Sequence, residues 1–577
     1  MKGKWFAFGC LTSIVLLIVI IISSIISLGK MSKSFSKDKV EQIEHGSYLL
    51  LNLNRQITDY SQYKGGFLFE EGLIAHEIIA KIKKSAEDKK IDGIILFPST
   101  MGCGYATLNE IEKALKDFKT SGKKVISYLE YGANKSYLLA SCADEIYMNP
   151  SASTGIFLSG IGGEILFYKD LFDKLGIDIF LLNAGDYKGA YENYTRRSFS
   201  EPVKRNVTAV YKQLYKKMLE KISENRNLSN QELKYIFEER DKLFLSGADA
   251  KKIGLVDETM FWNELKDKFK LTEGKLIEVS DYPMPNQKTK SNKIALIYAQ
   301  GIIIPESFMQ TGDIISAKNI SDIVDKIEKD DNIKGVILRI NSPGGSAFES
   351  EKIHGLLSRF NGKKPFLVSM GNVAASGGYY IASGADYIMA DPACITGSIG
   401  VAAMLPNLKK LTDKIGISSD EIGVGEFYNF LSLYQKPDQK KILMLKNQIE
   451  ETYLEFKTRV ADGRSLSLEE VEKIAQGQIW SGEKAVELGL VDEVGMLEDA
   501  VAKIAEMANL EDFSLVYFPK RKSFIEKIIA ERFNFEVKQE LIPDELSKDL
   551  DLEKIKQIYQ LAKTDPILTL LPLELDK

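Results

Sequence analysis

The chain has 577 residues, which is too long for one ordinary domain and allows three or four domains of about 150 residues each. Hydrophobic residues make up 44% of the sequence and charged residues 27%, and these globular values exclude wholesale disorder and a collagen-like structure. The net charge of −5 argues against a nucleic-acid partner, because binding the phosphate backbone needs an excess of Lys and Arg. Four cysteines without a CxxC pair indicate neither a disulfide framework nor a zinc site, and we expect no metal and no cofactor.

The chain begins with an apolar segment that we interpret as a membrane anchor. Residues 5–29 are 25 consecutive uncharged residues. At about 1.5 Å per residue, a helix of this length exceeds the roughly 30 Å hydrocarbon core of a bilayer. A cleaved signal peptide is the alternative, but its apolar region is usually shorter and ends in an A-x-A cleavage site, which this sequence lacks. The sequence therefore predicts one transmembrane helix that tethers the rest of the chain to a lipid bilayer. Lysines stand on both sides of the segment, so charge alone does not favour a cytoplasmic N-terminus.

The remaining chain consists of two related copies. Four pairs of similar segments occur in the same order: residues 91–96 with 333–338 and 139–144 with 381–386, both 242 residues apart (333 − 91 = 381 − 139 = 242), then 173–177 with 413–417 and 246–258 with 481–493. Ordered matches of this kind indicate a tandem duplication. We predict five units: a transmembrane anchor at 5–29, an N-terminal domain at 45–272, a linker at 273–292, a C-terminal domain at 293–510 and a helical C-terminal extension at 511–577.

Each copy alternates short β-branched runs with amphipathic segments. Buried strands are predicted at 93–97, 124–128, 335–340 and 366–370, and helices at 108–118 and 350–360. Strands that alternate with helices predict an α/β fold with a mostly parallel sheet layered by helices. After residue 515, residues 523–537 and 552–562 have a helical pattern, and the apolar end at 566–575 indicates packing or assembly.

Two segments of the second copy have the composition of a catalytic site. NSPGG at residues 341–345 follows a predicted strand, and its glycines place backbone N–H groups in a tight turn that can hold an oxyanion. GNVAASGGYY at 371–380 follows the next predicted strand and sets Ser376 among small residues at the start of a helix. Each has a simpler interpretation: an ordinary strand-to-helix turn for the first and a helix cap for Ser376. Ser376 is therefore a candidate nucleophile.

A serine nucleophile needs a base, and the histidines do not provide one. The sequence has three, His45, His76 and His354, and none falls on a strand end or turn near Ser376. A Ser-His-Asp triad is therefore disfavoured, and we expect the base to be a lysine or a carboxylate.

The duplication indicates which lysine is the base. Ser376 aligns with Asn134 (376 − 242 = 134), and NSPGG aligns with STMGC at 99–103, so the first copy lacks both elements. Conversely, Lys188 of the first copy aligns with Tyr428 of the second. A single lysine is usually a solvated surface residue, but these matched losses indicate that each copy retains one part of a two-part site.

Five motifs together resemble the signal peptide peptidase A family, also called protease IV, in its long, duplicated, membrane-bound form. They are NSPGG at 341–345, AASGGYYIAS at 374–383, TGSIGV at 396–401, GDYKGAYE at 185–192 and the GLVDE end of each copy. The resemblance covers residues 1–510. It implies a tandem pair of ClpP/crotonase-like β-α-β domains preceded by one transmembrane helix.

The resemblance also implies a role for particular residues. Ser376 is expected to be the nucleophile and Lys188 the general base of a Ser/Lys dyad. The expected oxyanion donors are Gly377 and the turn at Gly344 and Gly345, and Ser398 is a candidate hydroxyl that orients the lysine amine. An unperturbed lysine pKa is about 10.4, so the amine must be buried to act as a base at neutral pH.

The family further implies a membrane-anchored serine endopeptidase. Its expected substrates are cleaved signal peptides and other short or unfolded apolar peptides, bound as extended chains. A homotetramer is expected in the bacterial inner (plasma) membrane, with its catalytic body on the periplasmic, extracytoplasmic face. Two alternatives remain: a catalytically inactive membrane scaffold of the same fold, and a crotonase-like acyl-CoA enzyme, which usually acts through carboxylates.

Overall fold

The computed structural model describes residues 43–61, 72–286, 289–306, 313–521 and 567–570. The predicted anchor at 5–29 lies outside the described residues, as do the helices expected within 523–562. Over the ranges that are described, no helix combines the length and the apolar character needed to cross a membrane.

The first copy is built on a six-stranded sheet in which every neighbouring pair of strands is parallel. In spatial order the strands are β10 (Glu258–Thr259), β7 (Glu145–Met148), β5 (Lys124–Leu129), β4 (Ile91–Phe97), β1 (Ser47–Asn52) and β11 (Leu276–Glu278). The central strands are continuous apolar runs because side chains pack against both faces of the sheet.

The second copy has an eight-stranded sheet with the same core order. Its path is β21 (Ile479–Ser481), β19 (Ile395–Gly397), β17 (Phe366–Ala375), β15 (Ile333–Ser342), β12 (Lys293–Gln300) and β23 (Ser514–Phe518), with β18 (Tyr387–Ala390) beside β17 and β22 (Glu493–Val494) beside β18. The run β23-β12-β15-β17-β18-β22 corresponds strand for strand to β11-β1-β4-β5-β7-β10 of the first copy. The two halves therefore share one topology.

The edge strand of each large sheet differs from the expected domain limits. β11 falls within the stretch expected to be a linker, and β23 falls after residue 510. Each of these strands pairs with the first strand of its copy, across more than two hundred residues of sequence. A local pattern does not reveal such a pairing. The described parts of the segment expected to be a helical extension include two strands, β23 and β24 (Ile567–Leu570).

Helices surround both sheets. In the first copy they are α2 (Ala75–Glu87), α3 (Tyr105–Lys119), α4 (Asn134–Ala140), α5 (Lys169–Leu175), α6 (Glu192–Thr195), α7 (Glu201–Arg226), α8 (Asn230–Lys234), α9 (Gly247–Lys252) and α10 (Trp262–Lys268). In the second they are α11 (Ala317–Lys329), α12 (Ala347–Leu357), α13 (Gly377–Ala382), α14 (Lys409–Lys414), α15 (Gln439–Arg464), α16 (Leu468–Ile474), α17 (Gly482–Glu487) and α18 (Leu497–Met507).

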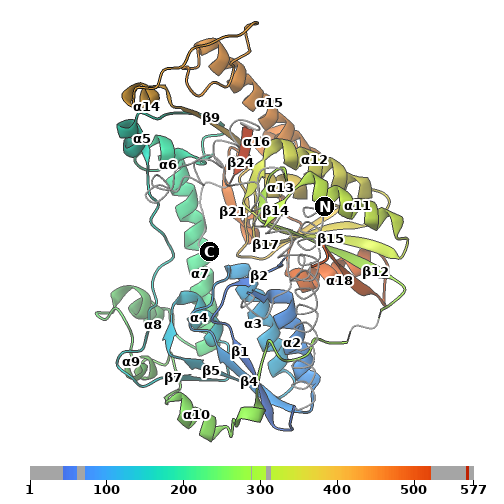
Figure 1. Ribbon diagram of the computed structural model, residues 1–577. Coiled ribbons are helices and arrows are strands. Elements are labelled where there is room, and N and C mark those ends of the chain that lie inside the picture. The colour runs from blue at the N-terminus through green and yellow to red at the C-terminus, as the bar shows by residue number, and fades with distance from the viewer. Residues whose placement is uncertain (1–42, 62–71, 287–288, 307–312, 522–566, 571–577) are drawn as a thin grey trace, which may run out of the picture.

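A third sheet joins the two copies. Its order is β14 (Ile314–Ile315), β13 (Ile302–Ile303), β16 (Gly344–Ser346), β24, β20 (Val401–Asn407) and β9 (Asp178–Ala184). β9 comes from the first copy, and all seven of its residues pair antiparallel with the seven of β20. Figure 1 shows the result: β9, α5 and α6 lie at the top beside α14 of the second copy, and α7 runs back down to the first copy. Two short strand pairs, β2 (Ile57–Thr58) with β3 (Leu73–Ile74) and β6 (Tyr131–Gly132) with β8 (Gly155–Ile156), complete the fold.

A buried ion cluster also connects the copies. Arg339, on β15, is 1% exposed and forms ion pairs with Asp59 at 3.0 Å and Glu110 at 2.9 Å, both from the first copy. Burial raises the pKa of Glu110 to about 7, although the nearby Arg339 charge opposes this shift. Beside the cluster, Asn372 donates from Nδ2 to Thr107 Oγ1 at 2.8 Å. The interface between the copies is therefore partly polar and specific.

Candidate active site

Ser376 lies where the central strand of the second sheet meets a helix. β17 ends at Ala375 and α13 begins at Gly377, so Ser376 occupies the single residue between them. Its φ of 56° and ψ of −118° are unusual for a residue with a side chain. Its N–H donates to the Gly397 carbonyl at 2.8 Å, which helps to hold this conformation. Backbone strain of this kind costs about 1–3 kcal/mol and is concentrated at functional sites.

Lys188 reaches Ser376 through the ladder between β9 and β20. β9 ends at Ala184, which pairs with Val401, and Lys188 follows four residues later. On the other strand, Ser398 precedes Val401 by three residues. The ladder therefore brings the lysine of the first copy to the Ser398 turn of the second, although the two residues are 210 positions apart in the sequence.

The lysine amine is surrounded by oxygen atoms. Lys188 Nζ lies 2.7 Å from Ser376 Oγ and 3.1 Å from Ser398 Oγ, and it donates to the Ser398 carbonyl at 2.9 Å. Lys188 is 1% exposed, and both serines are fully buried. Burial holds the pKa of Lys188 well below its ordinary value, because desolvation disfavours the ammonium form. The arrangement brings together a hydroxyl, an amine whose neutral, proton-accepting form is favoured by burial, and a second hydroxyl that contacts the amine.

A loop of the second copy supports Lys188 from behind, and sequence reasoning did not identify it. A Cβ atom on Gly477 would lie 2.5 Å from the backbone N and Cα of Lys188. A Cβ on Gly185 would lie 2.5 Å from the backbone of Gln476, whose carbonyl accepts from the Tyr187 N–H at 2.9 Å. Only glycine permits this approach, and both glycines have positive φ. In the sequence, this glycine is marked only by the dipeptide Gly477-Gln478 shortly before Ser481, which belongs to none of the duplicated motifs.

The predicted oxyanion glycines also lie at this junction. Gly377 is the first residue of α13, directly after Ser376. Gly344 and Gly345 belong to β16, and the Gly344 N–H donates to Ser342 Oγ at 3.2 Å. A Cβ on Gly378 would lie 2.8 Å from the Ser342 carbonyl, so the start of α13 packs directly on the end of β15. The two groups of glycines therefore converge from neighbouring strand ends.

The equivalent positions of the other copy do not form such a site. Asn134, which aligns with Ser376, uses its side chain to bind the backbone of Ser159: Nδ2 donates to the Ser159 carbonyl and Oδ1 accepts from its N–H, both at 2.9 Å. Tyr428, which aligns with Lys188, is 49% exposed, and its hydroxyl donates to Glu421. The matched losses read from the sequence therefore correspond to two different local structures.

The histidines lie elsewhere. His354 packs its ring edge-on against Tyr380, and the His76 ring stacks against both Tyr298 and Tyr517. Among the residues that the structure describes, no three His, Cys, Asp or Glu side chains are grouped so that they could hold a metal ion.

Comparison with known proteins identifies the family. Peptidase family S49 matches residues 117–275 and 358–511, once in each copy, and these matches cover more than half of the chain. The chain belongs to peptidase family S49. This S49 protein is 34% identical to "Protease 4" of Haemophilus influenzae over 87% of its own length and 85% of the relative. It is 31% identical to "Protease 4" of Salmonella typhi, over 78% and 75% of the two chains.

Other matches extend the comparison. The S49 chain is 28% identical to "Serine protease SPPA, chloroplastic" of Arabidopsis thaliana, over 82% of this chain and 70% of the relative. A mutant ClpP1 from Listeria monocytogenes aligns with a TM-score of 0.25 and 16% identity, over 36% of this chain and 94% of that one. The family expected from the motifs is confirmed, and so are the tandem domains and the assignment as a serine protease. The kinship with ClpP and crotonase folds stays a prediction.

Proposed function

We propose that this S49 chain is a Ser/Lys endopeptidase in which Ser376 is the nucleophile and Lys188 is the general base. The distance of 2.7 Å between Lys188 Nζ and Ser376 Oγ, in a fully buried pair, carries the proposal. A general base must be within hydrogen-bond reach of the proton that it removes, and a lysine must be mostly neutral to do so. Burial of Lys188 favours the neutral form. Membership of a peptidase family favours this function over an acyl-CoA enzyme or an inactive scaffold.

Each proton and bond in the reaction can be assigned. Ser376 Oγ attacks the carbonyl carbon of the substrate peptide bond while Lys188 Nζ accepts the hydroxyl proton. Lys188 then gives this proton to the leaving amine, the C–N bond breaks, and an acyl ester remains on Ser376. A water molecule, deprotonated by the same amine, hydrolyses the ester and restores the free hydroxyl. Ser398 holds the amine in position through both halves of the reaction.

The oxyanion is stabilised by backbone N–H groups of Gly377, Gly344 and Gly345. The Gly344 N–H exchanges its 3.2 Å bond to the neutral Ser342 hydroxyl for a bond to the charged oxygen. This exchange is favourable because charge-assisted hydrogen bonds are stronger than neutral ones. Loss of one such donor typically costs about 3–4 kcal/mol of transition-state stabilisation.

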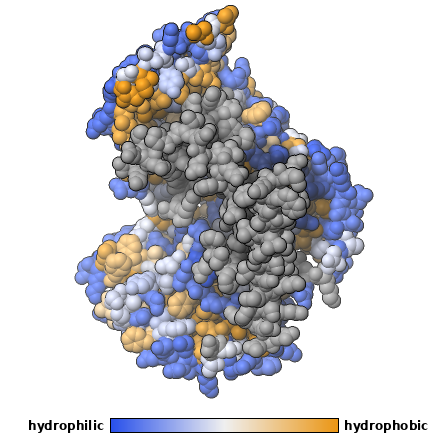
Figure 2. All heavy atoms as spheres, viewed as in Figure 1, coloured by the Kyte–Doolittle hydropathy of each residue, from blue (hydrophilic) through white to orange (hydrophobic). Residues whose placement is uncertain are grey.

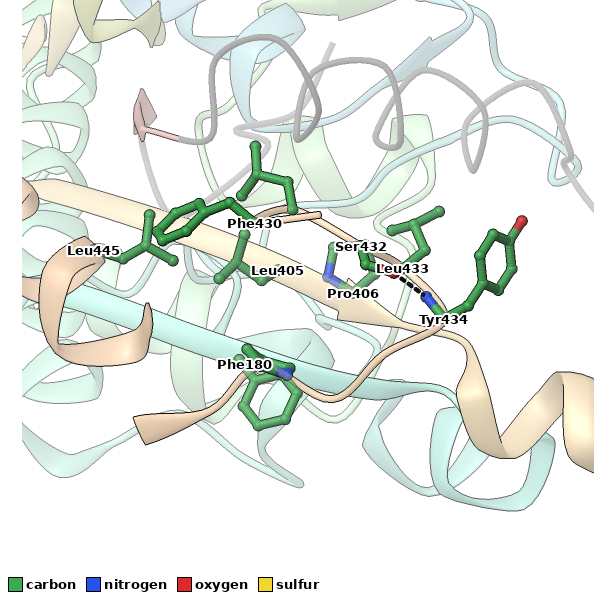
Figure 3. A pocket seen from close by; sticks show the side chains of 10 residues that line it. Phe180, Leu405, Pro406, Phe430, Ser432, Leu433, Tyr434 and Leu445 are labelled. Atoms are coloured by element: carbon green, nitrogen blue, oxygen red, sulfur yellow. Dashed lines mark hydrogen bonds between the residues drawn. The ribbon is translucent and has the colours of Figure 1, made fainter. Parts of the chain in front are cut away.

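The proposed substrates are apolar peptides, including the remnants of cleaved signal peptides. A relative in Enterococcus faecium is named "Putative signal peptide peptidase SppA" and is 33% identical over 40% of this chain and 67% of its own. The structure also has an apolar pocket of about 240 Å³ (Figure 3). It is lined mainly by Phe180, Leu405, Phe430, Leu433 and Leu445 and lies at the end of β20 that is farther from Ser398, so it does not bear on the side chains bound next to the dyad.

Anchoring and assembly are further parts of the proposal. The apolar segment at 5–29 supports a single-pass anchor in the bacterial inner membrane, with the catalytic body on the extracytoplasmic face. Self-association, which we take to give a homotetramer, is supported by large apolar side chains that are exposed in the segment after α14, the helix at the top of the molecule, where Figure 2 shows hydrophobic residues at the surface. These side chains are Ile415, Ile417, Ile422, Val424, Phe427 and Leu431. Exposed apolar patches of this kind mark interaction surfaces.

Two pairs of variants test the dyad. We expect Ser376→Ala and Lys188→Ala each to reduce hydrolysis of a fluorogenic apolar peptide by at least a thousandfold, because removing a member of a catalytic unit removes most of its effect. The matched controls are Ser383→Ala, a buried serine at the opposite end of α13, and Lys212→Ala, an exposed lysine on α7. Both controls should keep wild-type activity. Wild-type activity in Ser376→Ala or in Lys188→Ala would refute the role assigned to that residue.

A further inference from the structure

The loop between α16 and β21, residues 475–478 and here named the support loop, contacts two parts of the candidate site. Gly477 lies directly against the backbone of Lys188. The next residue, Gln478, accepts at its carbonyl from the Ser398 N–H at 2.6 Å. The support loop therefore holds both the segment that carries the base and the turn that carries the hydroxyl in contact with the amine.

The backbone of the support loop is in an unfavourable conformation. Gln476 and Gly477 follow one another with φ values of 58° and 84°. A left-handed conformation is costly for a residue with a side chain, such as Gln476, and persists only where the surrounding structure enforces it. The loop leads directly into β21, so the position of β21 helps to decide whether the loop keeps this shape.

A side chain of the first copy holds the outer edge of β21. Among the described strands, β21 is at the end of its sheet and pairs with β19 alone. On the other side, α7 passes next to β21 (Figure 1). Asn206 of α7 donates from Nδ2 to the Ile479 carbonyl at 3.0 Å and accepts at Oδ1 from the Ile479 N–H at 2.8 Å. One amide thus replaces the donor and the acceptor that a neighbouring strand would supply.

The place of α7 does not depend on Asn206 alone. Val210 and Leu214 of the same helix are buried in one apolar cluster with residues of β19 and β21. Two turns after Asn206, Gln213 accepts at Oε1 from Ser481 Oγ at 2.9 Å. The contact between α7 and the second copy therefore has several parts, and Asn206 is the part that binds the strand directly after the support loop.

We propose that Asn206 is a positioning residue for the Lys188 base: by fixing the edge of β21, it keeps the support loop against the lysine and water away from the amine. The proposal rests on the proposed function of the dyad. Burial is the cause that lowers the pKa of Lys188. A loosened loop would admit water, raise that pKa and leave less free amine at neutral pH. Asn206 thus acts on the reaction through the loop.

Kinetics of the full chain test the proposal. Asn206→Ala removes both hydrogen bonds, and Asn206→Asp keeps the shape of the side chain but has no donor for the Ile479 carbonyl. We expect each variant to lower kcat for a fluorogenic apolar peptide at least about tenfold while KM stays within about twofold. The rise of the pH–rate profile should move at least about half a pH unit higher. The control Gln213→Ala loses a contact between the same helix and the same strand, and should keep the wild-type profile. A wild-type pH–rate profile in both Asn206 variants would overturn the proposal, even if they were less stable.

Hydrogen exchange tests the loop without catalysis. In the full chain carrying Ser376→Ala, mass spectrometry follows the backbone amide of Tyr187, whose acceptor is a carbonyl of the support loop. We expect added Asn206→Ala to speed its exchange at least about tenfold, because local opening exposes the amide to water, and added Gln213→Ala to leave it unchanged. Unchanged exchange in the Asn206→Ala chain would overturn the proposal. If no chain hydrolyses the peptide, the proposed function fails, and the exchange rate still decides whether Asn206 holds the loop.

Discussion

Replacement of Lys188 by methionine tests the buried amine through folding rather than through catalysis. Methionine keeps most of the length and apolar bulk of the side chain but binds no proton. In the unfolded chain the amine is protonated below a pH of about 10.4, whereas in the folded protein burial holds its pKa well below that value. Between these two pKa values folding releases one proton. The free energy of unfolding of the wild type therefore rises with pH, and this contribution is absent in Lys188→Met.

The expected slope follows from proton linkage. One proton bound only in the unfolded state makes the free energy of unfolding rise by about 1.4 kcal/mol per pH unit. Between pH 7.5 and the unperturbed lysine pKa, the free energy of unfolding therefore rises by at most about 4 kcal/mol. We expect the stability of Lys188→Met minus that of the wild type to decrease with this slope toward pH 10. Loss of the contacts to Ser376 and Ser398 shifts the whole line down without changing its slope.

Urea denaturation of the full chain in detergent, followed by circular dichroism at half-unit steps from pH 7 to 10, measures this difference. Lys212→Met removes an exposed lysine from α7 and serves as the control. The difference in stability between this variant and the wild type should not change with pH over this range. A level difference for Lys188→Met as well would show that the folded protein holds an ammonium group at this site, and the argument for a neutral base would fail.

Three further substitutions test the surroundings of the site. Ser398→Ala removes a 3.1 Å contact to the amine and should reduce kcat/KM about five- to tenfold, so an unchanged pH–rate profile and rate would exclude an orienting role. Gly477→Ala pushes a methyl group against the backbone of the base and should reduce kcat/KM at least about a hundredfold. The control Gly362→Ala, at positive φ but in open space, should keep full activity. Arg339→Met removes the cation that pairs with two buried carboxylates and should destabilise the protein by about 3–5 kcal/mol; an unchanged thermal midpoint would contradict this.

Local sequence patterns predicted much of the fold. The apolar runs at 335–340 and 366–370 lie within β15 and β17, and the expected helix at 350–360 spans most of α12 and the turn after it. These elements follow from residue type and periodicity alone. The edge strands β11 and β23 were not predicted, because their positions depend on pairing with strands that lie far away in the sequence.

The candidate site shows the same division. Comparison of the two copies pointed to Ser376 and Lys188, and the structure brings their side chains together. The ladder between β9 and β20 that achieves this was not foreseen, since residues 178–184 have no counterpart strand in the second copy. Nor did the sequence reveal that Gly477 lies behind the lysine, because a side chain at this position would collide with the backbone of the other copy, which is far away in the sequence.

The β9–β20 ladder also creates a way to lose activity without unfolding. Adjacent residues on a strand are about 3.3 Å apart and face opposite sides, so a slip of one position would turn the lysine away from the serine, and a slip of two would move it by about 7 Å. Both halves would remain folded and their large sheets would stay intact, but the enzyme would be inactive. The amount of folded protein and the amount of active protein can therefore differ for this chain. Titration of the reactive serine counts the molecules in which β9 and β20 pair in the correct register, whereas a circular dichroism spectrum counts all molecules with folded sheets.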